Sequence, residues 1–320
     1  MNSTNDIVMV MGYPAMGKSR LAKPYIEQGY FRLNRDILGC GLDDLIPMMS
    51  KEYNNGETRF ILDNTYMTKE SRTPVIEWAQ KNGFSVKGIW LTSKTPKAIE
   101  VAQYNSCLRM IRRFGKLLSP DEIKAKKDPN TFPPAALFAY RKKLEKPKKK
   151  EGFDTLETVY FEREMDKEIY KNKAIILDYD GTLRKTKSGE KYPKTPDDIE
   201  ILPGRRETLD SYLERGYLLL GVSNQSFVGK GVITHKEAES CFEKTNELLG
   251  LDIDYRFCPH YYFPINCYCR KPMPGLGVEL VEEYKLNPDE TIMVGDQTTD
   301  KTFARRCGFQ FQHADKFFKM

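Results

Sequence analysis

Three cysteines and one histidine are gathered in the short stretch CPHYYFPINCYC. Cys258 and His260 form a C-x-H pair and, after six further residues, Cys267 and Cys269 form a C-x-C pair. Four soft or borderline ligands suit a tetrahedral Zn²⁺ with every position filled, which is the pattern of a structural site. Buried free thiols are the alternative interpretation, and a disulfide between Cys267 and Cys269 is geometrically awkward. The sequence therefore predicts a loop shaped by structural zinc.

A glycine-rich segment near the start can bind phosphate. The residues GYPAMGKS, from Gly12 to Ser19, match G-x-x-x-x-G-K-[ST] between an apolar run and a helical pattern. Gly12 and Gly17 would let backbone N–H groups wrap the β-phosphate of ATP or another nucleoside triphosphate. Lys18 would reach the β- and γ-phosphate oxygens, and Ser19 would ligate Mg²⁺. The alternative is a glycine-rich turn that binds no nucleotide.

Two aspartates could serve the nucleophile of a phosphoryl transfer. Asp36 in FRLNRD and Asp63 in FILDNT each follow a short predicted strand. A carboxylate near the γ-phosphate can take the proton of an attacking hydroxyl group. Either aspartate could instead be an ordinary helix N-cap.

Basic residues recur in two later segments. In NSCLRMIRRFGK the helical spacing places Arg109 on the same face as Arg112 and Arg113. Such a cluster could clamp phosphates, or it could be a solvated face. The run RKKLEKPKKK (141–150) is either a solvated helix end or a phosphate-backbone contact.

The elements that position these residues alternate between short apolar runs and helical patterns. In the first half the runs lie at 7–11, 59–65 and 85–92, and DTLETVYFERE can supply one last strand. The composition then becomes charged before a fresh run, AIILDYD, begins. Further runs follow at 217–224, 252–260, 290–296 and 309–315. This alternation predicts two doubly wound parallel α/β domains, 1–168 and 169–320.

The first domain resembles the 5′-hydroxyl polynucleotide kinase domain. The resemblance rests on GYPAMGKS, LNRD, LDNT, the arginine-bearing segment and AYRKKLEKPKKKEGFDTLE, over most of residues 5–165. It implies that Asp36 is the general base for the 5′-hydroxyl and that Asp63 helps to hold the acceptor and metal site. It also implies that a lid arginine, Arg109 or Arg113, binds the transferred phosphate.

The second domain resembles the haloacid-dehalogenase phosphatase superfamily. An apolar strand ends in D-x-D-G-T, from Asp178 to Thr182, and Ser223 of VSNQ ends the next strand. Lys271 follows the cysteine cluster, and GDQTTD contributes Asp296 and Asp300. The superfamily's pattern therefore occurs here in its usual order.

The chemistry that this resemblance implies uses all of these residues. Asp178 attacks phosphorus to give an aspartyl phosphate, and Asp180 protonates the leaving oxygen and then activates water. Asp178, the backbone carbonyl of Asp180 and Asp296 would hold Mg²⁺, while Ser223 and Lys271 neutralise the phosphoryl oxygens.

Little room remains for a cap over this second site. About twenty residues, RKTKSGEKYPKTPDDIEILPG, lie between Leu183 and the next helix, too few for a cap domain. We therefore expect an open site, which suits a large or extended substrate.

The two sites together predict an enzyme that heals nucleic-acid ends. It would phosphorylate 5′-hydroxyl ends with ATP and remove 3′-phosphates from DNA or RNA, preparing ends for a ligase. The rival interpretation is a metabolic sugar or histidinol phosphatase fused to a small-molecule kinase. It arises because the cysteine-rich insert resembles the zinc-bearing branch that includes histidinol phosphatase and heptose bisphosphate phosphatase. A nucleotide-dependent scaffold is disfavoured because both sites keep their ionisable groups.

The composition fits this interpretation without deciding it. The chain has 320 residues, a net charge of +6 and a pI of about 8.7, which is compatible with a nucleic-acid partner but short of a strongly basic signature. Seven cysteines, an odd number, argue for reduced thiols rather than a disulfide framework. With no long apolar segment and no leader-like start, we expect a cytoplasmic protein with no membrane partner.

Overall fold

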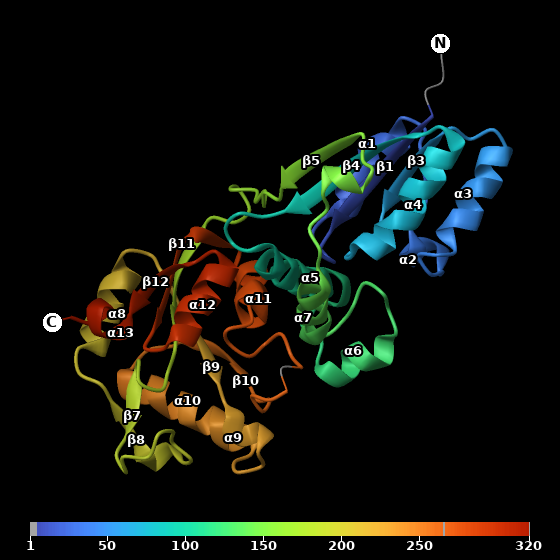
Figure 1. The fold of residues 1–320 in the computed structure, drawn as a ribbon. Helices are drawn as coiled ribbons and strands as arrows, with labels where there is room; N and C mark the ends of the chain where they lie inside the picture. The colour runs from blue at the N-terminus through green and yellow to red at the C-terminus, as the bar shows by residue number, and fades with distance from the viewer. Residues whose placement is uncertain (1–4, 265, 320) are drawn as a thin grey trace. The chain divides into compact units, whose positions relative to one another are not determined.

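The computed structural model describes residues 5–264 and 266–319, which form two compact units (Figure 1). The first unit contains the described residues up to Asn105 together with Asp128–Arg163. The second contains Ser106–Lys127 and the chain from Glu164 onward. The expected boundary near residue 168 lies close to the last junction, but the segment Ser106–Lys127, expected in the first domain, groups with the second unit.

The first unit is built on a five-stranded parallel sheet with the order β2-β3-β1-β4-β5. The strands are β1 (Asp6–Gly12), β2 (Phe31–Arg32), β3 (Arg59–Asp63), β4 (Ser85–Thr92) and β5 (Thr155–Tyr160). The chain fills one side of β1 with β2 and β3 and then the other side with β4 and β5. The predicted parallel sheet is therefore confirmed.

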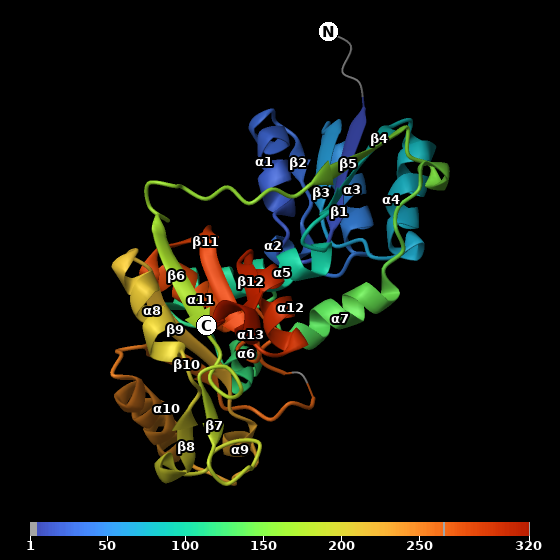
Figure 2. The same cartoon turned by 90° about the vertical axis from the view of Figure 1, so that its left-hand side faces the viewer.

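Helices cover both faces of this sheet because successive strand residues point to opposite sides. Ile7, Met9 and Met11 pack with apolar residues of α3 (Leu45–Asn54) and α4 (Lys69–Asn82). Val8 and Val10 pack instead with α1 (Lys18–Glu27). Figure 2 shows α1 and α4 on opposite sides of the strands. The remaining helical segments are α2 (Arg35–Leu38), α7 (Pro134–Lys143) and η1 (Lys149–Glu151). Helix α5 (Ala98–Phe114) begins in the first unit and ends in the second.

The second unit repeats the architecture with the order β10-β9-β6-β11-β12, all parallel. The strands are β6 (Asn172–Leu177), β9 (Leu218–Asn224), β10 (Asp254–Cys258), β11 (Leu286–Gly295) and β12 (Gln310–His313). The two doubly wound α/β domains predicted from the alternating pattern are thus present.

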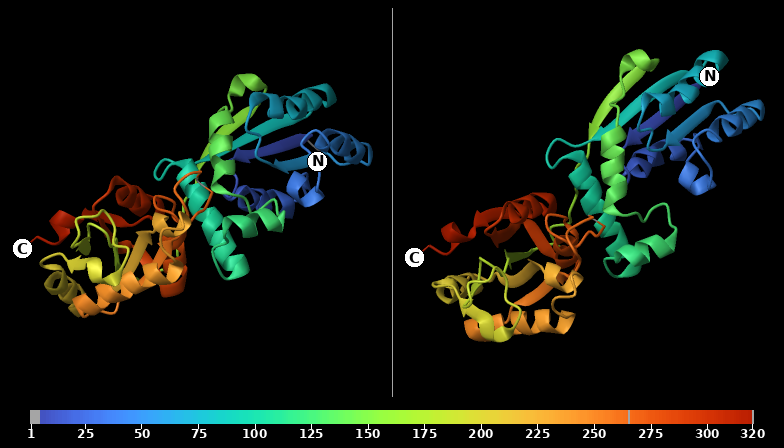
Figure 3. Two further views of the ribbon diagram at one scale, coloured as in Figure 1. Left: turned by 90° about the horizontal axis from the view of Figure 1, so that it is seen from below. Right: turned by 60° about the horizontal axis from the view of Figure 1, so that its bottom comes forward.

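The helices of the second unit also lie in two layers. Ile175 and Leu177 pack with apolar residues of α8 (Arg205–Glu214) and α10 (His235–Leu249). Ala174 and Ile176 pack with those of α11 (Gly275–Tyr284) and α12 (Thr298–Cys307). Figure 3 shows the yellow to orange pair and the red pair on opposite faces of the sheet. The shorter helices are α6 (Pro120–Lys126), α9 (Ser226–Gly229) and α13 (Ala314–Phe317).

A small hairpin stands where a cap domain would be inserted. Strands β7 (Arg184–Thr186) and β8 (Ile199–Ile201) pair antiparallel, with the short 3₁₀ helix η2 (Pro196–Asp198) between them. This agrees with the expectation that the second domain lacks a large cap. Among the described residues, none of the helices is both long and apolar enough to cross a bilayer.

Candidate active sites

Three neighbouring strands of the second sheet bring predicted site residues to one edge. Asp178 follows β6, Ser223 lies near the end of β9, and Asp296 follows β11. Because these strands are parallel and adjacent in the order β9-β6-β11, their carboxyl ends open on the same side. The strand order reverses between β6 and β11, the point where open α/β sheets bind ligands. The fold therefore assembles the predicted phosphatase site.

Three carboxylates and one lysine form the centre of this site. Ligand oxygens of Asp178, Asp296 and Asp300 lie within 4.8 Å of one another. Lys271 Nζ lies 2.7 Å from Asp178 Oδ1 and 2.8 Å from Asp300 Oδ1, with its side chain almost fully buried. One ammonium group thus faces three acids, which leaves a buried excess of negative charge.

This excess fits a hard divalent cation. Asp296 Oδ1 is buried without a hydrogen-bond partner, which is costly unless a cation or ligand compensates. Gly181 has a φ of +84°, and a Cβ there would lie 2.6 Å from Asp296 Oδ2, so glycine leaves this carboxylate its space. Clustered carboxylate oxygens are the ligands that Mg²⁺ takes. The residues present therefore fit the expected ion.

Burial and charge also perturb the ionisable groups. Burial raises the pKa of Asp178 to about 7, although the ammonium group of Lys271 opposes this shift. Burial alone would lower the pKa of Lys271, but Asp178 and Asp300 outweigh it, and its pKa is raised. Lys271 is therefore cationic at neutral pH, and a cation in the cluster would favour the ionised form of Asp178.

The carboxylate of Asp180 lies in a different set of contacts. Arg184 Nε donates to Asp180 Oδ1 at 2.8 Å, and Gln225 Nε2 donates to Asp180 Oδ2 at 3.2 Å. Arg184 is itself held by the carbonyl of Cys241 and the hydroxyl of Thr245. Asp300, to which we assigned no role, takes the third place in the carboxylate cluster. The Asp180 carboxylate is held outside that cluster by Arg184 and Gln225. Its role in proton transfer and the place of its backbone carbonyl at Mg²⁺ stay predictions.

The residues after Ser223 join the site to the cysteine-rich loop. The side chain of Asn224 accepts from the Lys271 N–H at 2.9 Å and donates to the Lys271 carbonyl at 3.0 Å. Gln225 donates through Nε2 to Ser223 Oγ at 3.0 Å and through its backbone N–H to the Cys258 carbonyl at 2.9 Å. The last residue of β9, Asn224, therefore holds the backbone of Lys271. The next residue, Gln225, contacts Ser223 and the start of the cysteine-rich loop.

The four predicted zinc ligands converge. The ligand atoms of Cys258, His260, Cys267 and Cys269 lie within 4.8 Å of one another. Cys258 Sγ is 3.5 Å from His260 Nδ1 and 3.8 Å from Cys267 Sγ, and His260 Nδ1 is 3.2 Å from Cys269 Sγ. These separations suit a small tetrahedral ion bound by two chain segments.

The thiols in this cluster are strongly coupled. A hydrogen bond with Cys258 lowers the pKa of Cys267 well below its ordinary value, and a bond with the same partner raises the pKa of Cys269. Three thiols this close repel one another if all of them are ionised. A bound divalent cation would compensate that charge and favour the thiolate form of each cysteine. The donor set therefore fits zinc, as predicted from the spacing.

The first site begins at the turn between β1 and α1. Gly12 has a φ of +148°, and a Cβ there would lie 2.5 Å from the Leu91 carbonyl, so the turn requires glycine. Lys18 Nζ donates to the carbonyls of Gly12 and Tyr13 at 3.2 and 2.9 Å. Gly17, in the left-handed conformation, precedes the first turn of α1. This is the strand, loop and helix order that a phosphate cradle requires.

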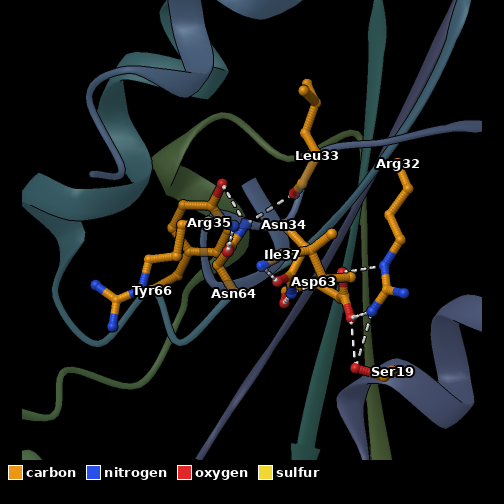
Figure 4. A network of polar contacts seen from close by, with 9 residues as sticks. All are labelled: Ser19, Arg32, Leu33, Asn34, Arg35, Ile37, Asp63, Asn64 and Tyr66. Carbon is orange, nitrogen blue, oxygen red and sulfur yellow. Dashed lines mark hydrogen bonds and ion pairs between the residues drawn. The ribbon is translucent and has the colours of Figure 1, made fainter. Parts of the chain in front are cut away.

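A polar network connects the cradle to β3 (Figure 4). Ser19 Oγ donates to Asp63 Oδ2 at 2.8 Å. Arg32 donates from Nε to Asp63 Oδ1 at 2.9 Å and from its terminal nitrogen to Asp63 Oδ2 and Ser19 Oγ at 2.5 and 2.9 Å. Two predicted residues, Ser19 and Asp63, thus lie together at the cradle, but Arg32 already balances the aspartate. A Mg²⁺ ion bound there would share these oxygens with the guanidinium group.

Two asparagines join the LNRD and LDNT segments. Asn34 Nδ2 donates to the Asp63 carbonyl at 2.7 Å, and Asn64 Nδ2 donates to the Leu33 carbonyl at 3.0 Å. Asn64 Oδ1 also accepts from the Arg35 N–H at 3.0 Å. Figure 4 shows these crossed contacts between the two loops. They fix the position of Asp63 relative to the start of α2.

Neither predicted aspartate caps a helix. Asn34 caps α2 by accepting from the Ile37 N–H, and Thr68 caps α4. Asp36 is exposed in the first turn of α2, where it pairs with Arg35 at 3.4 Å. The N-cap alternative is therefore wrong for both, and the general-base role of Asp36 stays a prediction.

The predicted lid arginines lie in the segment that groups with the second unit. Arg112 pairs with Glu282 at 3.1 Å and donates to the Tyr170 hydroxyl. The guanidinium of Arg113 lies over the ring of Phe114. Arg112 therefore holds α5 to Glu282 and Tyr170. The phosphate-binding role of Arg109 or Arg113 stays a prediction.

A buried ion pair lies directly after the basic run 141–150. Arg72, fully buried in α4, pairs in a bidentate manner with Glu151 at 2.7 and 2.9 Å. Beside it a cleft of about 660 Å³ is lined by Lys69, Glu145, Lys146, Lys148, Lys150 and Glu151. Glu145 accepts from the backbone N–H of Lys69. Four lysines therefore face this cleft, and the phosphate-contact alternative stays open.

Sequence reasoning missed several residues that hold these sites together. They are Arg32, Asn34 and Asn64 at the cradle and Arg184, Asn224 and Gln225 at the phosphatase site. All of them except Arg184 stand inside the motifs that were recognised, so their position in those motifs was a usable signal. Arg184 carried no such signal.

Comparisons with known proteins agree with the phosphatase site. Residues 173–318 match the family described as Polynucleotide kinase 3 phosphatase. The probable D-glycero-D-manno-heptose-1,7-bisphosphate 7-phosphatase of Thermoplasma volcanium is 34% identical over 145 residues, which is 44% of this chain and 97% of that protein. The D-glycero-beta-D-manno-heptose-1,7-bisphosphate 7-phosphatase of Haemophilus ducreyi is 31% identical over 150 residues, 42% of this chain and 79% of that protein.

A solved structure of the Pnkp1/Rnl/Hen1 RNA repair complex is similar across both units. It covers 98% of this chain and 96% of the matched chain, with 16% identity and a TM-score of 0.32.

Proposed function

Since the chain belongs, through residues 173–318, to a phosphatase family of the haloacid-dehalogenase superfamily, we propose that it heals nucleic-acid ends. Its second unit would remove 3′-phosphates and its first would phosphorylate 5′-hydroxyl groups, leaving ends that a ligase can join. The observation that carries this proposal is that one chain holds both a glycine-rich turn with Lys18, Ser19 and Asp63 and a carboxylate cluster with Lys271. The description of the matched family, Polynucleotide kinase 3 phosphatase, supports it.

In the phosphatase reaction, Asp178 attacks the phosphorus atom while Asp180 donates a proton to the departing 3′-oxygen. The bond from phosphorus to that oxygen breaks, and an aspartyl phosphate forms. Asp180 then removes a proton from water, which hydrolyses the acyl phosphate and restores Asp178. Lys271 and Ser223 bind the phosphoryl oxygens. Mg²⁺, when bound by Asp178 and Asp296, would neutralise charge on the phosphate.

In the kinase reaction, Asp36 accepts the proton of the 5′-hydroxyl group as its oxygen attacks the γ-phosphorus. The bond to the β-phosphate oxygen breaks and the nucleoside diphosphate leaves. Lys18 neutralises the β- and γ-phosphate oxygens. Asp63, held by Asn34 and Arg32, orients Ser19 at the edge of the cradle.

The test is a panel of DNA and RNA oligonucleotides that carry either a 5′-hydroxyl or a 3′-phosphate. We expect phosphate transfer from ATP to the first kind and phosphate release from the second. The proposal fails if neither is processed while small sugar phosphates are. Comparing the DNA and RNA arms also identifies the preferred nucleic acid.

The rival function is a metabolic phosphatase fused to a small-molecule kinase. It is favoured by one observation, that relatives at 34% and 31% identity are named as heptose-bisphosphate phosphatases. Rates on heptose 1,7-bisphosphate and histidinol phosphate, measured beside the 3′-phosphorylated oligonucleotides, separate the two. A higher kcat/KM on a small phosphate supports the rival.

A further inference from the structure

The loop between the zinc ligands exposes aromatic side chains. Directly after His260, the side chains of Tyr261, Tyr262 and Phe263 are 36%, 55% and 71% exposed. The rings of Tyr261 and Tyr262 lie 4.4 Å apart. We call Tyr261–Phe263 the aromatic loop. Consecutive exposed aromatic residues are unfavourable in water, so a group of this kind marks a binding surface.

One lysine lies beside this loop, and further aromatic and basic side chains gather at α9, which contacts the loop. Lys230 lies 5.3 Å from the ring centre of Tyr261. Next to it, Phe227 packs edge-on against Tyr192 at 5.7 Å, and Lys194 lies 6.0 Å from the ring centre of Phe227. Both Phe227 and Lys230 belong to or adjoin α9. The surface therefore alternates flat apolar faces with ammonium groups, the composition that binds unpaired bases and their phosphates.

Close contacts connect this surface to the catalytic residues. A Cβ on Gly229, the last residue of α9, would lie 2.5 Å from the backbone nitrogen of Tyr261, so helix and loop are in close contact. Gln225, just before α9, bonds the Asp180 carboxylate. Arg270, which precedes Lys271, donates to the His260 carbonyl at 3.2 Å. The aromatic loop is thus fixed to the same segments that position the proton donor and the lysine.

We propose that the aromatic loop stacks against the unpaired bases that precede a 3′-phosphate, while Lys230 and Lys194 neutralise their backbone phosphates. This inference rests on the proposed function and names its substrate more closely as single-stranded 3′ ends. Bases inside a duplex are stacked on both faces, and only the terminal pair leaves one face free for a protein ring. A duplex end should therefore gain little from this surface.

The test compares three substrates of the purified full-length enzyme. They are an unpaired oligonucleotide with a 3′-phosphate, the same strand in a blunt duplex, and p-nitrophenyl phosphate. For a variant carrying Tyr262→Ala and Phe263→Ala, we expect KM for the unpaired strand to rise about tenfold or more, the size of base stacking on aromatic residues. The kcat on that strand and the kcat/KM on p-nitrophenyl phosphate should stay unchanged.

Controls distinguish stacking from damage to the loop. Phe263→Trp should keep the wild-type KM because it keeps a flat ring, and Leu248→Ala, at a similarly exposed position on α10, should have no effect. Zinc content measured in each variant should match the wild type.

Three outcomes would contradict the inference or the proposed function. An unchanged KM for the unpaired strand in the double variant overturns the inference and leaves the proposed function standing. An equal loss on p-nitrophenyl phosphate or on a sugar phosphate also overturns it, because the loop would then serve the site in general. A wild-type enzyme that leaves the 3′-phosphate intact overturns the proposed function and the inference with it.

Discussion

The side-chain amide of Asn224 bonds both backbone groups of Lys271, accepting from its N–H at 2.9 Å and donating to its carbonyl at 3.0 Å. The backbone of the lysine is therefore fixed by a residue at the end of a neighbouring strand. This contact holds the backbone from which Nζ reaches Asp178 and Asp300.

Asn224→Ala should lower the phosphatase kcat about tenfold to a hundredfold, because a small displacement of a catalytic group has effects of this size. Steady-state rates on p-nitrophenyl phosphate measure it. Kinase activity should stay at the wild-type level. A kcat within twofold of wild type would show that Lys271 is positioned without this amide.

The two proposed activities should be separable by single substitutions. Asp178→Asn should abolish phosphate release because the amide cannot act as the nucleophile, and it should leave the kinase intact. Lys18→Ala should lower kinase activity at least a hundredfold by removing charge from the phosphate cradle, and it should leave the phosphatase intact. End-labelled substrates report both reactions in one assay.

Matched controls exist on the same elements. Lys23→Ala, at an exposed position on α1, and Asp252→Asn, at an exposed position before β10, should behave as wild type. Loss of both activities in either single active-site variant would mean that the two sites are not independent.

Protein purified without chelators should contain about one equivalent of zinc, because four donors converge on a single point. Cys267→Ser should lose the metal and lower the phosphatase rate more than the kinase rate, since the loop carries Lys271. Elemental analysis and the two assays check this. Cys40→Ser, outside the cluster, is the control. Less than about half an equivalent in the wild type would count against the site.

Arg72→Met should destabilise the first unit by about 3–5 kcal/mol, because it leaves the nearly buried Glu151 without its partner. The free energy of unfolding, from denaturant titration, measures the loss. Adding Glu151→Gln should restore part of it, because the unpaired buried charge is removed. Substituting Lys23, whose pair with Glu27 is exposed, should change stability by less than about 1 kcal/mol. An Arg72 variant as stable as this control would contradict the argument.

The fold class could be predicted from the residue pattern alone, and so could most of the residues that the two candidate sites bring together. Apolar runs such as β1 and β6 must be buried strands, and the glycine-rich turn and D-x-D-G-T allow few backbone paths. The C-x-H and C-x-C pairs were sufficient to predict a four-ligand cluster. These signals are local, because each depends on residues within one turn, strand or loop.

The tertiary structure alone decided which side chains meet across segments. Arg184 reaches Asp180, Asp300 joins Asp178, and Arg32 pairs with Asp63, although none of these pairs is marked by a periodic pattern. The grouping of Ser106–Lys127 with the second unit is another such result. The physical reason is that strand order and crossover geometry set these distances, and one sequence read locally does not contain them.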